Sequence, residues 1–235
     1  MTPSDTMLAA INLVLWVCVA IGIVLGALGF IYGGLNRRSV WFAITMMVSA
    51  AWAIMMVISY ANDAEFQNHA AGWLNIPPVL LFFTAPQMAL SYIEMPSKTR
   101  WLIYILALIP VVIFSTMMVF APGFLLLSAS SGPNGDEFLL EFNPYTMVIM
   151  GIQMVLLTVV TMMAMVKARK EARTPLGKKL MRNVMIGFLC GFLLGGVFNI
   201  AMSDWHWMHW FGPTATLIYA FMMYTAVIKY GADEV

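Results

Sequence analysis

Long apolar segments alternate with short polar connections along almost the whole chain, and this alternation predicts membrane-spanning helices. A helix needs about 20 mostly apolar residues to cross a bilayer. Segments near this length are expected at residues 7–35, 40–60, 73–94, 101–120, 145–166, 183–202 and 213–230. The predicted fold is therefore an all-α polytopic membrane protein, with a single seven-helix transmembrane domain over residues 1–235.

The distribution of charged residues predicts how these helices are oriented. A strongly basic connection runs from Lys167 to Arg182 between two apolar segments, and Lys and Arg are retained on the cytoplasmic side during insertion. Counting spans from this connection places all 12 Lys and Arg residues on one side. The opposite connections carry Asp and Glu but no Lys or Arg. We expect a multi-pass protein of the cytoplasmic (inner) membrane, with its N-terminus outside and its C-terminus in the cytoplasm.

Composition supports a lipid environment, because 62% of the residues are hydrophobic and only 10% are charged. Soluble domains are near half apolar and about a quarter charged. The start of the chain, MTPSDTM, lacks a basic segment and a cleavage site, so no cleavable signal peptide is expected. Cys18 and Cys190 lie inside apolar runs and are expected to be small buried hydrophobic residues.

The interiors of the predicted spans contain no ionisable residue, and such residues mark proton relays, ion paths and cofactor ligands. An ion-coupled pump, a membrane haem protein and an enzyme are therefore not expected. The polar residues in the spans have two interpretations: hydrogen bonds between helices, or a polar ligand cleft. The residues of the proposed cleft and of an aromatic cap on its outer side are Asn75, Gln87, Gln153, Asn199, Trp205, Trp207 and Trp210.

The segment WHWMHW raises a metal hypothesis, because His206 and His209 are three residues apart and Asp204 is nearby. Imidazole and carboxylate groups bind zinc or copper. The favoured interpretation is an aromatic belt at the membrane surface, so no metal is predicted. The 22 methionines could bind Cu(I), but they often occur as adjacent pairs. Neighbouring residues point about 100° apart on a helix, so flexible packing is the expected use.

The basic connection is expected to contact anionic lipid headgroups or a cytoplasmic protein partner. Its basic residues are Lys167, Arg169, Lys170, Arg173, Lys178, Lys179 and Arg182. In the first span, Gly22-x-x-x-Gly26 and Gly29-x-x-x-Gly33 suit close helix packing, within the chain or in a homo-oligomer. No nucleic-acid partner is expected.

Several motifs resemble the seven-transmembrane N-terminal sensor region of prokaryotic histidine kinases. These are Trp52 in the second span, the proline-containing third span followed by MPSKTR, the basic connection, and the ending from Tyr224 to Tyr230. The resemblance implies a membrane sensor. Since the chain ends five residues after Tyr230, without a phospho-acceptor helix or an ATP-binding domain, the output would pass through another protein.

A fainter resemblance is to microbial rhodopsins, carried by WFAITMM and WLNIPPVLLFF in the second and third spans. Retinal needs a lysine in the middle of the seventh helix and an acidic counter-ion. Lys229 is too near the cytoplasmic end, and Gly72 and Asn75 offer no carboxylate. Retinal is therefore not expected, and no cofactor is predicted, although a lysine-free relative of this fold stays open.

These observations predict a non-enzymatic membrane sensor or signalling module. It would bind a small apolar or lipid-like ligand within the helix bundle, toward its outer side, and act through a partner protein. The alternative is an accessory or structural subunit of a larger integral membrane complex, with pigment, quinone or lipid contacts. A small transporter would need an internal repeat, and none is seen in the sequence.

Overall fold

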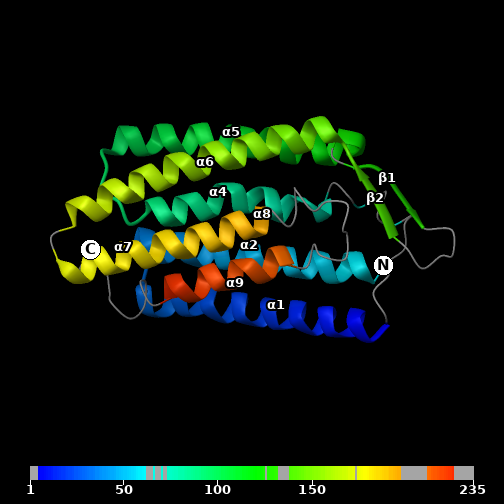
Figure 1. Cartoon of the computed structure of the whole chain (residues 1–235), viewed down its shortest axis with the longest axis horizontal. Coiled ribbons are helices and arrows are strands. Elements are labelled where there is room, and N and C mark those ends of the chain that lie inside the picture. Colours follow the sequence, from blue (N-terminus) through cyan, green and yellow to red (C-terminus); the bar gives the residue numbers. More distant parts are fainter. Residues whose placement is uncertain are drawn as a thin grey trace.

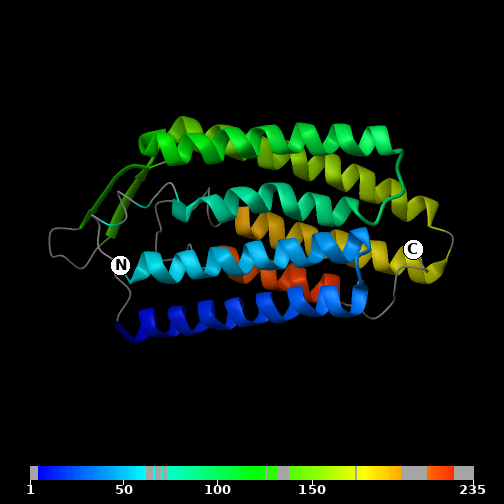
Figure 2. The same cartoon turned by 180° about the vertical axis from the view of Figure 1, so that it is seen from behind.

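The computed structural model of the chain describes residues 5–61, 66, 70, 73–124, 126–131, 138–172, 174–196 and 211–224. Long helices run side by side along one axis and form a bundle, with a β-hairpin at one end (Figure 1). The same arrangement is seen from behind in Figure 2. The helices are α1 (Asp5–Gly33), α2 (Arg37–Tyr60), α4 (Ile76–Leu90), α5 (Ser97–Phe120), α6 (Pro144–Glu171), α7 (Pro175–Phe188), α8 (Leu194–Gly196) and α9 (Phe211–Tyr224). The strands are β1 (Leu126–Ser131) and β2 (Phe138–Phe142).

Four of the described helices are long and apolar enough to cross a membrane: Thr6–Gly33, Arg37–Tyr60, Ser97–Phe120 and Pro144–Glu171. They correspond to the first, second, fourth and fifth predicted spans. Helix α4 is a shorter apolar helix of 15 residues. At 1.5 Å per residue it extends about 22 Å, less than the hydrocarbon core of a bilayer. Of the seventh predicted span, residues 213–224 lie in α9, and residues 225–230 lie outside the described residues.

The prolines of α4 and α5 occupy two kinds of position. Pro77 and Pro78 occupy the first turn of α4. A proline is tolerated there because the first backbone N–H groups of a helix have no intrahelical partner. Pro86 lies inside α4 and Pro110 inside α5. Each removes one hydrogen bond from its helix and favours a kink.

The prediction of a basic loop is wrong, because most of its described residues are helical. The last residues of α6 and the first residues of α7 carry them, and only residues 172–174 lie between the two helices. Thr174 begins α7 early: its Oγ1 accepts a hydrogen bond from the Gly177 backbone N–H at 2.9 Å, and Pro175 follows at the first helical position. The helix that contains the start of the sixth predicted span therefore begins at Pro175, before Asn183, and residues 197–202 of that span lie outside the described residues.

The long polar connection after α5 contains the two strands. Within the described residues, these strands are where the structure departs from the predicted all-α fold. Strand β1 pairs with β2 in an antiparallel hairpin, with an irregularity between Leu126 and Ser128. A 3₁₀ turn, Pro122–Phe124, precedes β1. The Thr146 hydroxyl donates a hydrogen bond to the Phe124 carbonyl, which ties this turn to the start of α6. The hairpin projects beyond the end of the bundle (Figure 1).

Glycines bring α1 and α2 into close contact. A Cβ atom added at Gly22 would lie 3.0 Å from the Ala50 Cβ, and one added at Gly29 would lie 2.7 Å from Cδ1 of Phe42. The glycines of the first span are therefore used for packing within the chain. At the turn between these helices, Gly34 has a φ of +63°, which favours glycine.

Three clusters form the core of the described bundle: one joins α1 and α2, and the other two include residues of α4. The larger joins α2, α4, α6, α7 and α9, and its fully buried members include Phe42, Met88, Met165, Phe188 and Tyr219. The smaller joins α4, α5 and α6 through Val79, Val111, Phe114, Met118 and Met150. The outward faces of α5 and α6 are exposed and apolar. Such a surface suits lipid and is unusual in water.

Candidate functional site

Helix α4 lies inside the bundle and is the element on which a candidate site can be built. It contacts α2, α5, α6 and α7. Every residue from Thr84 to Leu90 is buried, including the polar side chains of Thr84 and Gln87. These two residues are three positions apart, so they lie on the same side of the helix. A polar face of α4 is therefore enclosed by neighbouring helices.

The side chain of Gln87 is the most unusual group on this face. Its exposed fraction is 0%, and neither Oε1 nor Nε2 has a hydrogen-bond partner in the described structure. The hydroxyl of Thr84, which is 4% exposed, also lacks a hydrogen-bond partner among the described residues. Leaving a buried polar group unpaired costs about 1–3 kcal/mol. An amide offers two donors and an acceptor, so the pair could bind a small molecule with complementary polar atoms.

Between Thr84 and Gln87, the backbone of α4 forms a hydrogen bond with α9. The hydroxyl of Tyr219 donates a hydrogen bond to the Ala85 carbonyl at 3.0 Å, directly before Pro86. The Tyr219 ring packs edge to face on Phe188 of α7, with ring centroids 6.0 Å apart. Tyr219 is 1% exposed, so this contact is in the interior. The candidate site near Gln87 is therefore connected to α7 and α9.

A close approach between α7 and α9 makes this contact possible. The segment Leu189–Leu193, which continues α7, has a π-helical turn. Within it, a Cβ atom added at Gly191 would lie 2.4 Å from the Tyr219 Cβ. The absence of a side chain at Gly191 therefore leaves room for the Tyr219 ring. π-Helical turns in other proteins are frequent at functional sites.

Of the residues predicted to line the cleft, the structure describes Asn75, Gln87 and Gln153, and it places Asn75 and Gln87 at opposite ends of α4. Asn75 precedes the first turn of α4 and its side chain forms no cap, whereas Gln87 lies in the last turn. Gln87 follows Asn75 by twelve positions, which corresponds to about 18 Å along the helix axis. Gln153 is half-buried on α6. Asn199, Trp205, Trp207 and Trp210 lie outside the described residues.

The candidate metal ligands Asp204, His206 and His209 also lie outside the described residues. Among the residues that are described, no group of three or more His, Cys, Asp or Glu side chains could hold a metal ion. Cys18 is buried and Cys190 is half-buried, and both are free thiols. The expected burial is therefore seen for Cys18 and only in part for Cys190.

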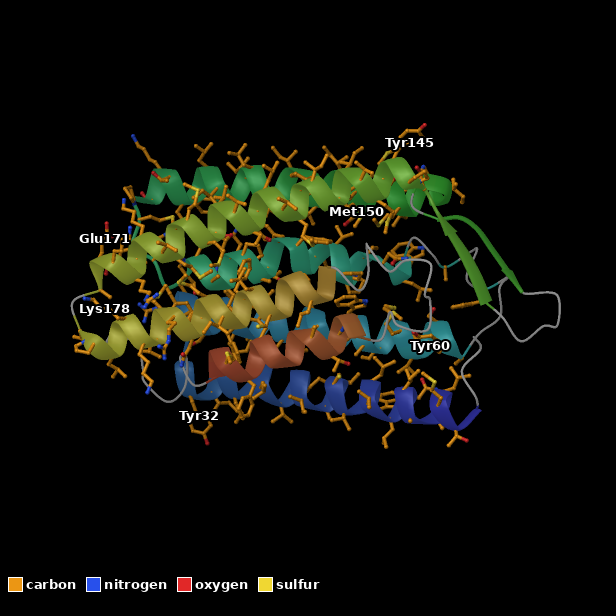
Figure 3. The ribbon with its side chains drawn as sticks, in the orientation of Figure 1. Tyr32, Tyr60, Tyr145, Met150, Glu171 and Lys178 are labelled. Atoms are coloured by element: carbon orange, nitrogen blue, oxygen red, sulfur yellow. The ribbon has the colours of Figure 1, made fainter. Side chains whose placement is uncertain are left out.

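The described cations gather at one end of the bundle. In Figure 3, Glu171 and Lys178 lie at the same end as Tyr32, and Tyr60 and Tyr145 lie at the opposite end. Lys167, at 77% side-chain exposure, forms an ion pair with Glu171 at 3.9 Å on the surface of α6. The basic residues placed at this end are Arg37, Arg38, Lys98, Arg100, Lys167, Arg169, Lys170, Lys178, Lys179 and Arg182. Arg173 is outside the described residues.

One interaction at this end was not predicted. The Arg37 side chain donates to the Tyr104 hydroxyl from Nε at 3.1 Å and to the Leu90 carbonyl from Nη2 at 2.9 Å. Trp41 donates to the same hydroxyl from Nε1 at 3.2 Å. Arg37 thus links the start of α2 to the end of α4 and to α5. The sequence contained a signal for this interaction, because Arg37 and Trp41 are four residues apart and lie on the same side of a helix. The sequence analysis used Arg37 only to predict the orientation of the spans.

Comparison with known proteins gives no assignment. No protein-family model matches the chain, and no curated protein matches it significantly. The resemblance to the sensor region of histidine kinases therefore stays a prediction.

Proposed function

We propose that the protein is a non-enzymatic sensor or signalling module of the inner membrane, which binds a small lipid-like molecule between its helices. The observation that carries the proposal is the Gln87 side chain, fully buried with both amide atoms unpaired in the described structure. Burial of such a group is costly unless something satisfies it. Gln87 is in the last turn of α4, so under the orientation proposed below the site would lie nearer the cytoplasmic end than the sequence hypothesis expected.

The proposal includes a seven-span topology with the N-terminus outside and the C-terminus in the cytoplasm. The gathering of the described cations at one end of the bundle supports this orientation. The acidic residues Asp136 and Glu141 belong to the connection between α5 and α6, which follows the opposite end of α5. A cysteine placed at Lys178 should be labelled only from inside the cell, and one placed at Tyr145 only from outside.

Ligand binding would act through α4 and α9. Pro86 separates Gln87 from Ala85, whose carbonyl accepts the Tyr219 hydroxyl. A molecule that binds Gln87 more tightly in one arrangement of α4 than in another would shift the population toward the first arrangement. The connection through Tyr219 would pass this shift to α7, whose first turns carry Lys178 and Lys179. These exposed lysines are suited to contact a cytoplasmic partner.

The test compares the wild type with Gln87→Met and with the matched control Gln153→Met. Methionine has a similar shape but no strong donor or acceptor. After purification in mild detergent, native mass spectrometry should find a bound non-protein molecule on the wild type and on Gln153→Met, and lose it on Gln87→Met. After delipidation, Gln87→Met should be more stable by about 1–3 kcal/mol, because an unpaired buried amide has been removed. Retention of the same molecule by Gln87→Met would contradict the proposal.

The alternative function is an accessory subunit of a larger membrane complex. The observation in its favour is the apolar outward surface of α5 and α6, which could contact lipid or another integral protein. The two proposals differ in what is purified with the chain. A stoichiometric integral membrane protein would favour the subunit, whereas a monomer or homodimer with a bound small molecule would favour the sensor.

A further inference from the structure

Three buried polar side chains lie on one side of α4. Thr84, Gln87 and Ser91 are spaced by three and four residues, which places them on the same side of the helix. Their exposed fractions are 4%, 0% and 6%. The Ser91 hydroxyl donates a hydrogen bond to the Met88 carbonyl at 2.6 Å. Neither Oγ1 of Thr84 nor either amide atom of Gln87 has such a partner in the described structure, so these two side chains need a further one.

The hydroxyl of Thr84 does not bond to the backbone of its own helix. A threonine inside a helix can satisfy its hydroxyl by donating to the carbonyl four residues earlier. Thr45 in α2 does so to Trp41 at 2.8 Å, and Thr158 in α6 does so to Met154 at 2.8 Å. Thr84 makes no such bond among the described residues. Its hydroxyl is therefore able to donate to a further molecule beside Gln87.

The amide of Gln87 determines which head group can satisfy it. A complete partner must accept from Nε2 and donate to Oε1 at the same time. A primary carboxamide or an undissociated carboxylic acid does this with two parallel hydrogen bonds, because its donor and its acceptor lie side by side in one plane. A carboxylate, an ester and a quinone offer acceptors only, so each would leave Oε1 unpaired.

The surroundings of Gln87 favour a neutral head group on an apolar chain. No residue of α4 is ionisable, and apart from Thr84 and Gln87 its buried residues are apolar. Arg37 of α2 meets α4 at the Leu90 carbonyl, and it also donates to the Tyr104 hydroxyl. An ionised group costs far more to bury than a neutral one.

We propose that the molecule bound at Gln87 is a neutral single-chain lipid whose head group carries a donor beside an acceptor, as a primary fatty amide or an undissociated fatty acid does. The head group accepts from Nε2 of Gln87 and donates to Oε1, and its carbonyl oxygen also accepts from the Thr84 hydroxyl. This inference rests on the proposed function, because it names the ligand class of the same site. It excludes quinones, esters and ionised lipids from that site.

The test compares two probes of equal chain length, dodecanamide and methyl dodecanoate, of which only the amide can donate. Native mass spectrometry of the delipidated full chain in mild detergent gives the Kd of each probe. On the wild type the amide should bind about tenfold more tightly than the ester, because the ester leaves Oε1 of Gln87 unpaired. Gln87→Met should bring the two Kd values within about twofold of each other, and the control Gln153→Met should keep the wild-type ratio. Thr84→Val should weaken both probes about fivefold, because both carry the carbonyl that its hydroxyl reaches.

Dodecanoic acid, titrated beside the amide in mildly acidic buffer, distinguishes the two sources of the head group. A Kd equal to that of the amide would support a fatty acid as the ligand, and a Kd as weak as that of the ester would support an amide.

This inference and the proposed function can fail separately. Equal Kd values for amide and ester on the wild type, an unchanged ratio in Gln87→Met, unchanged Kd values in Thr84→Val, or no binding of either probe would each overturn the inference. If Gln87→Met nevertheless loses a molecule that is purified with the wild type, the proposed function stands with a ligand of another class. If no probe binds and no molecule is purified with the wild type, both are overturned.

Discussion

The contact between Gly191 and Tyr219 gives a prediction whose size can be worked out from the structure. In Gly191→Ala the added Cβ atom would lie 2.4 Å from the Tyr219 Cβ and 3.2 Å from the Ala215 carbonyl oxygen. Neither atom is the end of a flexible side chain. Tyr219 is also held by its hydrogen bond to Ala85 and by Phe188. Relief of the clash therefore requires α9 to move away from α7.

The expected loss is the difference between two opposing effects. Overpacking a core position typically costs about 1–3 kcal/mol. Replacing glycine by alanine in a helix returns up to about 1 kcal/mol. Gly191→Ala should therefore lower the free energy of unfolding by about 1–2 kcal/mol. The control is Gly26→Ala, where the nearest atoms would lie at 3.5 Å, an ordinary contact, so its stability should be unchanged or slightly higher.

The assay uses the buried thiol of Cys18, which is 3% exposed. In a Cys190→Ala background, a thiol-reactive fluorescent dye should report unfolding in detergent as the temperature rises. Gly191→Ala should unfold at a lower temperature than Gly26→Ala. Equal transitions for the two variants would refute the reasoning, because the α7–α9 contact would then have room for a side chain.

Three further substitutions test other contacts by the same assay. Arg37→Gln should cost about 1–3 kcal/mol, since it weakens the links to Tyr104 and Leu90; an unchanged transition would show that these bonds do not hold α2 to α4 and α5. Tyr219→Phe should cost about 1 kcal/mol, because only the bond to the Ala85 carbonyl is lost, and a larger loss would mean that the hydroxyl has further partners. Lys167→Gln should leave the transition unchanged, because its ion pair with Glu171 is on the surface, and a clear shift would contradict that expectation.

The sequence predicts the helices well where length and hydrophobicity decide the outcome. The first, second, fourth and fifth spans needed only a count of apolar residues. The start of α7 was misplaced because positive charge suggested a loop, although Lys and Arg are good helix formers and Thr174 and Pro175 are strong start signals. The hairpin was missed because its strands are short and the segment between them in the sequence is rich in glycine, proline and polar residues.

The candidate site was less predictable because it depends on which residues face one another. Gln87 and Asn75 were both identified from their polarity within a predicted span, which does not show whether two residues face one another. Their separation along α4 follows from helix geometry once the boundaries of α4 are known. The role of Tyr219 could not be read from the sequence, since its partner Ala85 is 134 residues away.

The order in which these contacts can form has a consequence for biogenesis. The glycine contacts between α1 and α2 join neighbouring segments, so this pair can form while the rest of the chain is still being translated. Helix α9 is different: it meets α1 through Cys18 and Thr214, at 3.8 Å, and meets α4 through Tyr219 and Ala85. The α1–α2 pair can therefore form first, and its contact with α9 can form only after α9 leaves the ribosome. A nascent chain stalled before Phe211 would hold the Ala85 carbonyl without its tyrosine, and the surroundings of Gln87 would be assembled only after the stall was relieved.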